Sequence, residues 1–190
     1  SNTVTMSRRK VMQNGVAAIG GIAIGMSSSA DAEELASGNY KLVDIFRECK
    51  DLGVVRFLSV NPYGAVLEAL GKLDYALVPF EIPMGKSKGQ YVRIAGPNAE
   101  EHLVANFECS INLDNAATLA FDKLNGPTGE LYSMRIMNAD GEKILSILLN
   151  YDIDGNDGKP GKYYPGAVDK WLSLRSTYAD INGDVDLRAY

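Results

Sequence analysis

A predicted β-hairpin in the second half of this 190-residue chain constrains its fold more than any other feature. Two runs of equal length, ELYSMRIMN and EKILSILLN, are separated by the three residues ADG. Asp140-Gly141 favours the positive φ that a tight hairpin turn needs. The equal runs and the short turn together predict a firm register between two antiparallel strands.

The side-chain pattern of this hairpin predicts where it lies in a sheet. Because successive strand residues point to opposite faces, Tyr132, Met134 and Ile136 share one face of the first strand. The second strand is apolar on both of its faces, which is typical of a strand that is covered on both sides. We therefore expect the hairpin in the middle of a sheet.

Three further segments have the composition of strands. VVRFLSV, from Val54 to Val60, is rich in β-branched residues and is followed by the turn-forming NPYG from Asn61 to Gly64. YALVPFEIP and QYVRIAG flank the glycine-bounded GKSKG. This arrangement predicts two more strands with a loop between them.

Two helices are predicted, one before and one after the strand-rich region. In the first, apolar residues recur at the spacing of one helix face, at Leu42, Ile45, Phe46 and Cys49. Asn39 is its expected N-cap, and Gly53 stands where it ends. The second helix follows Pro165. It contains Val168, Trp171, Leu172 and Arg175.

These elements predict an α+β fold for residues 31–190, with a mainly antiparallel β-sheet flanked by helices. A single N-terminal hydrophobic helix is expected to precede this domain. Residues 11–30 contain no charged residue, and as a helix they would be about 30 Å long, which matches the hydrocarbon core of a bilayer.

The charges around this hydrophobic segment predict its orientation. The basic region 1–10 contains Arg8, Arg9 and Lys10, whereas Asp31 and Glu33 follow the segment. The positive-inside rule then places the body of the protein on the lumenal (thylakoid) or periplasmic side. Because the basic residues and the small-residue end are similar to a twin-arginine export signal, we expect either a retained single-pass membrane anchor or an uncleaved signal.

Small residues recur every four positions in this segment, at Ala17, Gly21 and Gly25. Such a stripe allows the backbones of two membrane helices to approach closely. The sequence therefore predicts the lipid bilayer and the transmembrane helices of other subunits as partners.

Charge and histidine content exclude several functional classes. The formal net charge of −5 argues against a nucleic-acid surface, which needs a basic patch. His102 is the one histidine of the chain. Ser-His-Asp or Cys-His catalysis needs a histidine base beside the nucleophile, so the sequence argues against it. We expect no enzymatic activity.

The two cysteines have no zinc-binding partners at suitable spacing. Cys49 and Cys109 could form a disulfide outside a reducing compartment. Alternatively both are buried free thiols, because Cys49 falls on the apolar stripe of the first predicted helix.

Several short motifs are similar to those of one protein family. They are VLEALGKL from Val66 to Leu73, QYVRIAG, EHLVANFEC from Glu101 to Cys109, and MRIMNADGEKILSILL. In this order they resemble the haem-utilisation carriers of the ChuX/HutX type, relatives of each half of the larger HemS/ChuS proteins. The resemblance covers about Val54 to Ala179.

This resemblance implies a haem site and a turn at VLEALGKL. His102 takes the place of a family histidine, and its imidazole would be an axial ligand to haem iron. The alternative is a hydrogen-bonded surface histidine. Tyr132 and Met134 would either reach the same groove or belong to the core. A second family histidine falls on Asn61, and an amide is a poor haem ligand.

Two functions remain open from the sequence. The first is a non-catalytic, membrane-anchored accessory subunit of a membrane protein complex, and a thylakoid photosynthetic complex would suit a twin-arginine route. The second is a haem-binding or haem-transfer protein that uses His102, with a tetrapyrrole or pigment as its partner. The small-residue helix and Asn61 favour the first.

Overall fold

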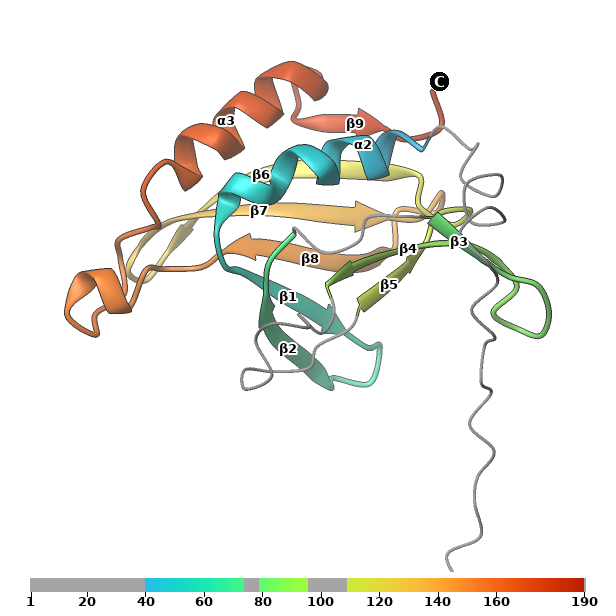
Figure 1. Ribbon diagram of the computed structural model, residues 1–190, viewed down its shortest axis with the longest axis horizontal. Coiled ribbons are helices and arrows are strands. Elements are labelled where there is room, and N and C mark those ends of the chain that lie inside the picture. The colour runs from blue at the N-terminus through green and yellow to red at the C-terminus, as the bar shows by residue number, and fades with distance from the viewer. Residues whose placement is uncertain (1–39, 74–78, 96–108, 190) are drawn as a thin grey trace, which may run out of the picture.

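The computed structural model describes residues 40–73, 79–95 and 109–189 (Figure 1). The predictions for residues 1–39, which include Ala17, Gly21 and Gly25, lie outside this part, and so does His102. Within the described ranges, no helix combines the length and the apolar character needed to cross a bilayer.

A six-stranded antiparallel sheet forms the centre of the domain, in the order β2-β1-β8-β7-β6-β9. Its strands are β1 (Val55–Val60), β2 (Val66–Gly71), β6 (Thr118–Gly126), β7 (Gly129–Met137), β8 (Lys143–Leu149) and β9 (Asp184–Asp186). The β7–β8 hairpin lies in the middle of the order. The prediction of a central hairpin is thus confirmed.

A second, three-stranded antiparallel sheet consists of β3 (Pro79–Ile82), β4 (Gly89–Ala95) and β5 (Cys109–Asn112). The two strands predicted around GKSKG are β3 and β4, which pair with each other. The described residues therefore contain two sheets, where the sequence predicted a single one.

The turn between β7 and β8 is built by a glycine and an asparagine. Gly141 has a φ of 78°, as the sequence predicts for this turn. The side-chain oxygen of Asn138 accepts hydrogen bonds from the backbone N–H groups of Asp140 and Glu142, at 3.0 and 2.8 Å. This Asx turn fixes the register in which Met134 lies opposite Ile147.

The described helices are α2 (Lys41–Glu48), which continues as the 3-10 helix η1 (Cys49–Leu52), the short 3-10 helix η2 (Asp154–Asn156), and α3 (Ala167–Tyr178). Gly53 follows η1 with a φ of 71°, which confirms the predicted end. The prediction of Asn39 as N-cap is wrong. Tyr40 occupies that position, and its carbonyl accepts from the N–H groups of Val43 and Asp44.

Helices α2 and α3 cover the same face of the large sheet (Figure 1). Trp171 of α3 packs edge-on against Phe121 of β6 and Tyr132 of β7, with ring centroids 5.4 and 5.2 Å apart. Tyr132, Met134 and Ile136 are all buried, as expected for one shared core face. We call this the inner face of the sheet.

The opposite, outer face has a different composition. The register places Leu70 of β2, Arg56 of β1 and Leu148 of β8 in one row on it. Arg135 of β7 donates two hydrogen bonds to the carboxylate of Asp122 on β6. This face therefore combines apolar side chains with a bidentate ion pair.

One segment differs from its prediction, and another forms a strand that the sequence did not predict. The turn implied for VLEALGKL is wrong, because Val66–Gly71 is strand β2 and pairs with β1 over its whole length. The backbone groups on this edge of β1 need hydrogen-bond partners, and β2 supplies them. The acidic tail after Asp180 also contains a strand, β9, which pairs with β6.

The packing of α3 leads to a stability prediction. Trp171 is 1% exposed, so Trp171→Ala should lower the free energy of unfolding by about 3–5 kcal/mol through lost burial and a new cavity. The neighbouring Leu172 is 45% exposed, and Leu172→Ala should cost less than about 1 kcal/mol. Urea unfolding followed by circular dichroism measures both. Equal losses would contradict this account of the core.

Candidate functional site

An apolar cavity of about 270 Å³ lies between the two sheets. We call it the intersheet cavity. The described residues that line it come from β1, β2 and the start of β8 in the large sheet, and from β5 in the small sheet. They are Phe57, Ser59, Leu67, Ala69, Cys109, Ser110, Ile111, Ile144 and Leu145.

The strand register explains why this cavity exists. Phe57 and Ser59 alternate with outer-face residues on β1, and they lie opposite Ala69 and Leu67 of β2. Small side chains at Ser59 and Ala69 leave space where larger ones would pack against the second sheet. Leu67 is 68% exposed, so the cavity is open to solvent near β2.

Cys109 at the start of β5 is the described cavity residue with a donor atom suited to a soft metal. It is partly buried, and burial raises the pKa of its thiol to about 11. Cys49 is fully buried at the start of η1, where burial raises the pKa of its thiol to about 12. Both are free thiols, and both are protonated at neutral pH.

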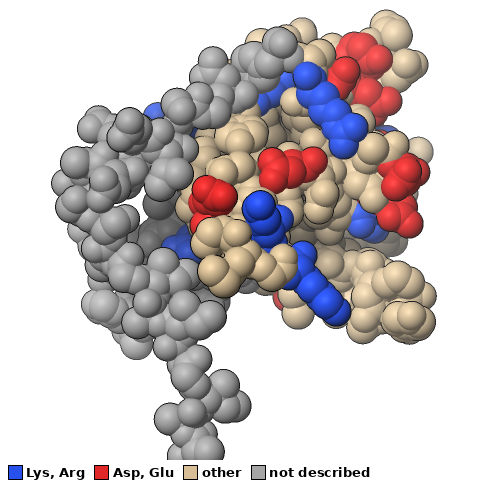
Figure 2. Space-filling model, turned by 90° about the vertical axis from the view of Figure 1, so that its right-hand side faces the viewer, with Lys and Arg blue, Asp and Glu red and all other residues tan. Residues whose placement is uncertain are grey.

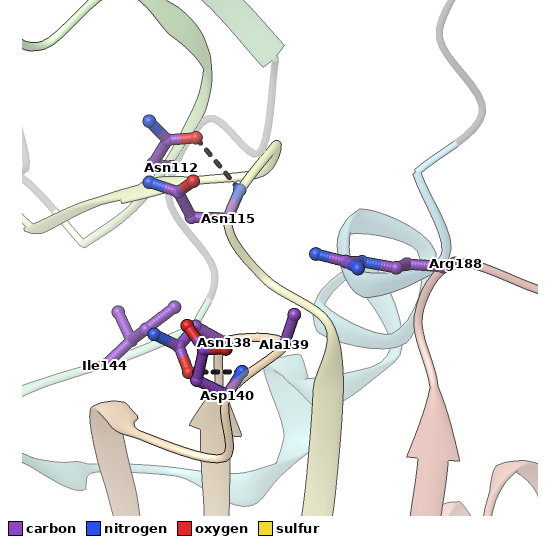
Figure 3. A pocket seen from close by; sticks show the side chains of 7 residues that line it. All are labelled: Asn112, Asn115, Asn138, Ala139, Asp140, Ile144 and Arg188. Atoms are coloured by element: carbon purple, nitrogen blue, oxygen red, sulfur yellow. Dashed lines mark hydrogen bonds between the residues drawn. The ribbon is translucent and has the colours of Figure 1, made fainter.

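A second, more polar cavity of about 330 Å³ lies at the end of the large sheet. We call it the turn cavity. It is bounded by the residues after β5, by the β7–β8 turn and by the C-terminal segment (Figure 3). Its lining residues are Asn112, Asn115, Asn138, Ala139, Asp140, Ile144 and Arg188.

Two of the asparagines in the turn cavity already hold the local backbone. Asn138 organises the β7–β8 turn, and its amide donates to the Glu142 carboxylate at 2.9 Å. Asn112 accepts from the N–H groups of Asp114 and Asn115, at 2.9 and 3.2 Å, and donates to the hydroxyl of Tyr91 at 3.1 Å. These side chains therefore shape the walls.

Two other polar side chains of the turn cavity have unused hydrogen-bonding capacity. The guanidinium group of Arg188 and the side-chain amide of Asn115 have no hydrogen-bond partner among the described residues. Figure 3 shows the Arg188 side chain extending from the C-terminal segment toward the two turns. Donors are thus available to a ligand in this cavity.

Charges of both signs surround this end of the molecule. Figure 2 looks from the right-hand side of Figure 1 and shows Lys and Arg side chains next to Asp and Glu side chains. Asp140 contributes a carboxylate to the turn cavity itself. Recognition here therefore depends on individual donors and acceptors, since no broad field of one sign is visible on the described part of this face.

The residues that the sequence proposed for a ligand site do not come together in either cavity of the described structure. Tyr132 and Met134 are 7% and 1% exposed, belong to the core, and line neither cavity. The Tyr132 hydroxyl donates to the Glu130 carboxylate at 2.7 Å, and this hydrogen bond raises the pKa of Tyr132. His102 lies outside the described residues.

Asn61, the position of the second family histidine, lies in the β1–β2 turn. Its side-chain oxygen accepts from the N–H groups of Tyr63 and Ala65, both at 3.0 Å. This asparagine therefore stabilises a turn. In the described ranges, His, Cys, Asp and Glu side chains form no group of three that could hold a metal ion.

Sequence reasoning missed the residues that line both cavities. Ala69 and Ile144 are ordinary strand residues, and their importance depends on which strands become neighbours. The signal that could have found them is the occurrence of small residues at Ser59, Ala69 and Ser110, in segments that form strands of the two sheets. It becomes informative only when the pairing of these strands is known.

The fold is similar to those of several solved structures. A protein from Agrobacterium tumefaciens matches with a TM-score of 0.52 and 21% sequence identity, over 72% of this chain and 66% of the other. A protein from Erwinia carotovora matches with a TM-score of 0.50 and 18% identity, over 72% of this chain and 70% of the other. ChuX matches with a TM-score of 0.49 and 16% identity, over 72% and 71%.

These similarities confirm the predicted likeness to ChuX-type structures, at low sequence identity. They show an α+β fold with mainly antiparallel sheets. The chain spans just under two thirds of the length of the Agrobacterium protein. No family model matches the sequence, and neither does any curated protein.

The burial of the cysteines leads to a prediction about their reactivity. A pKa of about 11 for Cys109, against an ordinary value of 9.0, lowers its thiolate fraction at pH 8 by about 100-fold. Alkylation of Cys109 by iodoacetamide at pH 8 should therefore be at least about 100-fold slower in the folded protein than in urea.

Mass spectrometry of the cysteine peptides would measure the two rates separately. Cys49 is the internal control, because it is completely buried and should react more slowly than Cys109 in the folded protein. Similar rates for Cys109 in the folded and unfolded states would show that its thiol is not in the environment described.

Proposed function

We propose that this domain binds haem, with the apolar macrocycle inserted into the intersheet cavity. The observation on which this proposal rests is an apolar, open-sided cavity between two sheets in a fold of this type. Sites for small molecules are concave and mostly apolar, with few polar groups. The motif resemblance to haem-utilisation carriers supports haem as the ligand.

The lining fits a flat apolar ligand. Phe57, Leu67 and Ile111 line it with aromatic and aliphatic side chains. Leu67 is 68% exposed, whereas Phe57 and Ile111 are each 2% exposed, so the apolar surface that a ligand would cover comes mainly from Leu67. Burying such surface is favourable by about 25 cal/mol per Å² removed from water. A volume of about 270 Å³ is just below the range of roughly 300–1,000 Å³ that is typical of small-molecule sites. The macrocycle would therefore remain partly exposed, which suits a protein that passes its ligand on.

His102 is the proposed axial ligand to the iron. It precedes Cys109 by seven residues, and Cys109 lines the cavity. An extended connection of that length spans at most roughly 25 Å. Neutral imidazole donates a lone pair to haem iron, whereas the Cys109 thiol would first have to lose its proton. This chemistry favours His102 over Cys109 as the ligand.

We propose binding and transfer for this domain, without a catalytic step. The membrane-subunit hypothesis depends on residues 11–30 and on Ala17, Gly21 and Gly25, which lie outside the described residues. It stays a prediction. Haem binding is the stronger proposal, because the intersheet cavity is a specific site for the macrocycle.

Titration of the purified protein with haemin tests the proposal through the Soret absorption band. We expect a saturable shift of the band with the wild-type protein. His102→Ala should abolish the spectrum of the ligated iron, and Cys109→Ser should keep it. Loss of the spectrum in Cys109→Ser alone would identify the thiolate as the ligand and contradict the assignment to His102.

A matched pair of substitutions on β2 tests the location. Ala69 lines the cavity, whereas Leu70 points to the outer face of the same strand and is 49% exposed. Ala69→Phe should fill the cavity and weaken haemin binding by about tenfold or more, equivalent to about 1.4 kcal/mol. Leu70→Phe should leave the affinity unchanged. Absence of any saturable shift would rule out haem binding, and equal effects would rule out this cavity.

A further inference from the structure

We infer that the two cavities form one amphipathic site, in which the intersheet cavity takes an apolar body and the turn cavity binds a carboxylate through Arg188. This inference rests on the proposed function for the identity of the ligand. It assigns a binding role to Arg188, which no sequence motif singled out.

The first observation is that the cavities adjoin. Ile144 lines both of them, so the two cavities share a wall at the start of β8. It is partly exposed, and it lies beside the irregular pairing where the register shifts between Ile136 and Met137. A ligand that leaves the intersheet cavity along β8 therefore reaches the turn cavity.

The second observation is the unused donor capacity described above. An arginine guanidinium binds a carboxylate through two parallel N–H···O hydrogen bonds, and such charge-assisted bonds are stronger than neutral ones. Arg188 is exposed and lines the turn cavity, so its guanidinium group is available to an anionic group there. Asn115 lines the same cavity, but Figure 3 shows its side-chain amide turned away from Arg188.

The acidic side chains around the turn cavity oppose the binding of an anionic ligand. Asp140 also lines the turn cavity, and its negative charge opposes an anionic ligand. Glu142 lies in the same turn, where its carboxylate accepts a hydrogen bond from Asn138. Arg188 is therefore the group that decides whether a carboxylate binds, and removal of the Asp140 charge should strengthen its binding.

The ligand class follows from the two halves of the site. It has a flat or elongated apolar body and at least one carboxylate at its edge. Haem fits this description, because its macrocycle is apolar and it has two propionate groups on one side. In haem, the propionates would lie in the turn cavity while the macrocycle occupies the intersheet cavity.

Haemin and its dimethyl ester, in which both propionates are blocked, distinguish the two halves of the site. We expect Arg188→Ala to weaken haemin binding by about tenfold and to leave ester binding unchanged. Asp140→Asn should tighten haemin binding and leave the ester unaffected. Arg47→Ala is the matched control, because this arginine lies on α2 and pairs with Asp44. It should change neither affinity.

The outcomes separate this inference from the proposed function. If haemin binds and Arg188→Ala changes neither affinity, the carboxylate role of Arg188 is overturned while haem binding stands. If haemin does not bind, the proposed function fails. Hexanoate then replaces haemin as the probe, and hexanol is its neutral counterpart. Tighter binding of hexanoate than of hexanol, lost in Arg188→Ala, would support the inference, and no such preference would overturn it.

Competition with acetate tests whether the turn cavity binds any free carboxylate or only a carboxylate that belongs to the larger ligand. We expect acetate to compete with haemin only weakly, because it lacks the apolar body. If acetate lowers the affinity for haemin as much as Arg188→Ala does, the turn cavity is an independent anion site. This result would overturn the inference of a single site.

Discussion

The structure depends on the antiparallel pairing of β7 with β8 and on the burial of their shared inner face. Met134 and Ile147 lie opposite each other there, and Trp171 covers the neighbouring Tyr132. Cross-strand pairs and aromatic contacts of this kind stabilise a sheet through the area they remove from water. Every other strand of the large sheet is added to one side or the other of this hairpin.

The same pairing places the candidate site. β1 adds to β8 and β2 adds to β1, so the small side chains of Ser59 and Ala69 come to lie beneath the second sheet. On the other side of Ile144, the turn that Asn138 organises forms a wall of the polar cavity. An apolar space and a polar space thus meet at the start of one central strand.

Local features of the fold could be predicted from the sequence, whereas the site could not. Asp140-Gly141 and the alternation around Met134 predicted the central hairpin, because both signals act over a few residues. The pattern failed for Val66–Gly71, since this segment becomes a strand only through its pairing with β1. Arg188 gave no signal, and the small side chain of Ala69 is informative only once its strand pairing is known, because cavities depend on strands that are distant in sequence. The ligand role of His102 stays a prediction.

The most direct measurement of the central claim is a paramagnetic relaxation experiment by NMR on the protein with bound ferric haemin. If the macrocycle lies in the intersheet cavity, the amide signals of Ser59, Ala69 and Ser110 should broaden strongly, while those of Gly126 and Gly129 at the far β6–β7 turn should stay sharp. Broadening centred on the β6–β7 turn, or spread evenly over the surface, would contradict haem binding between the two sheets.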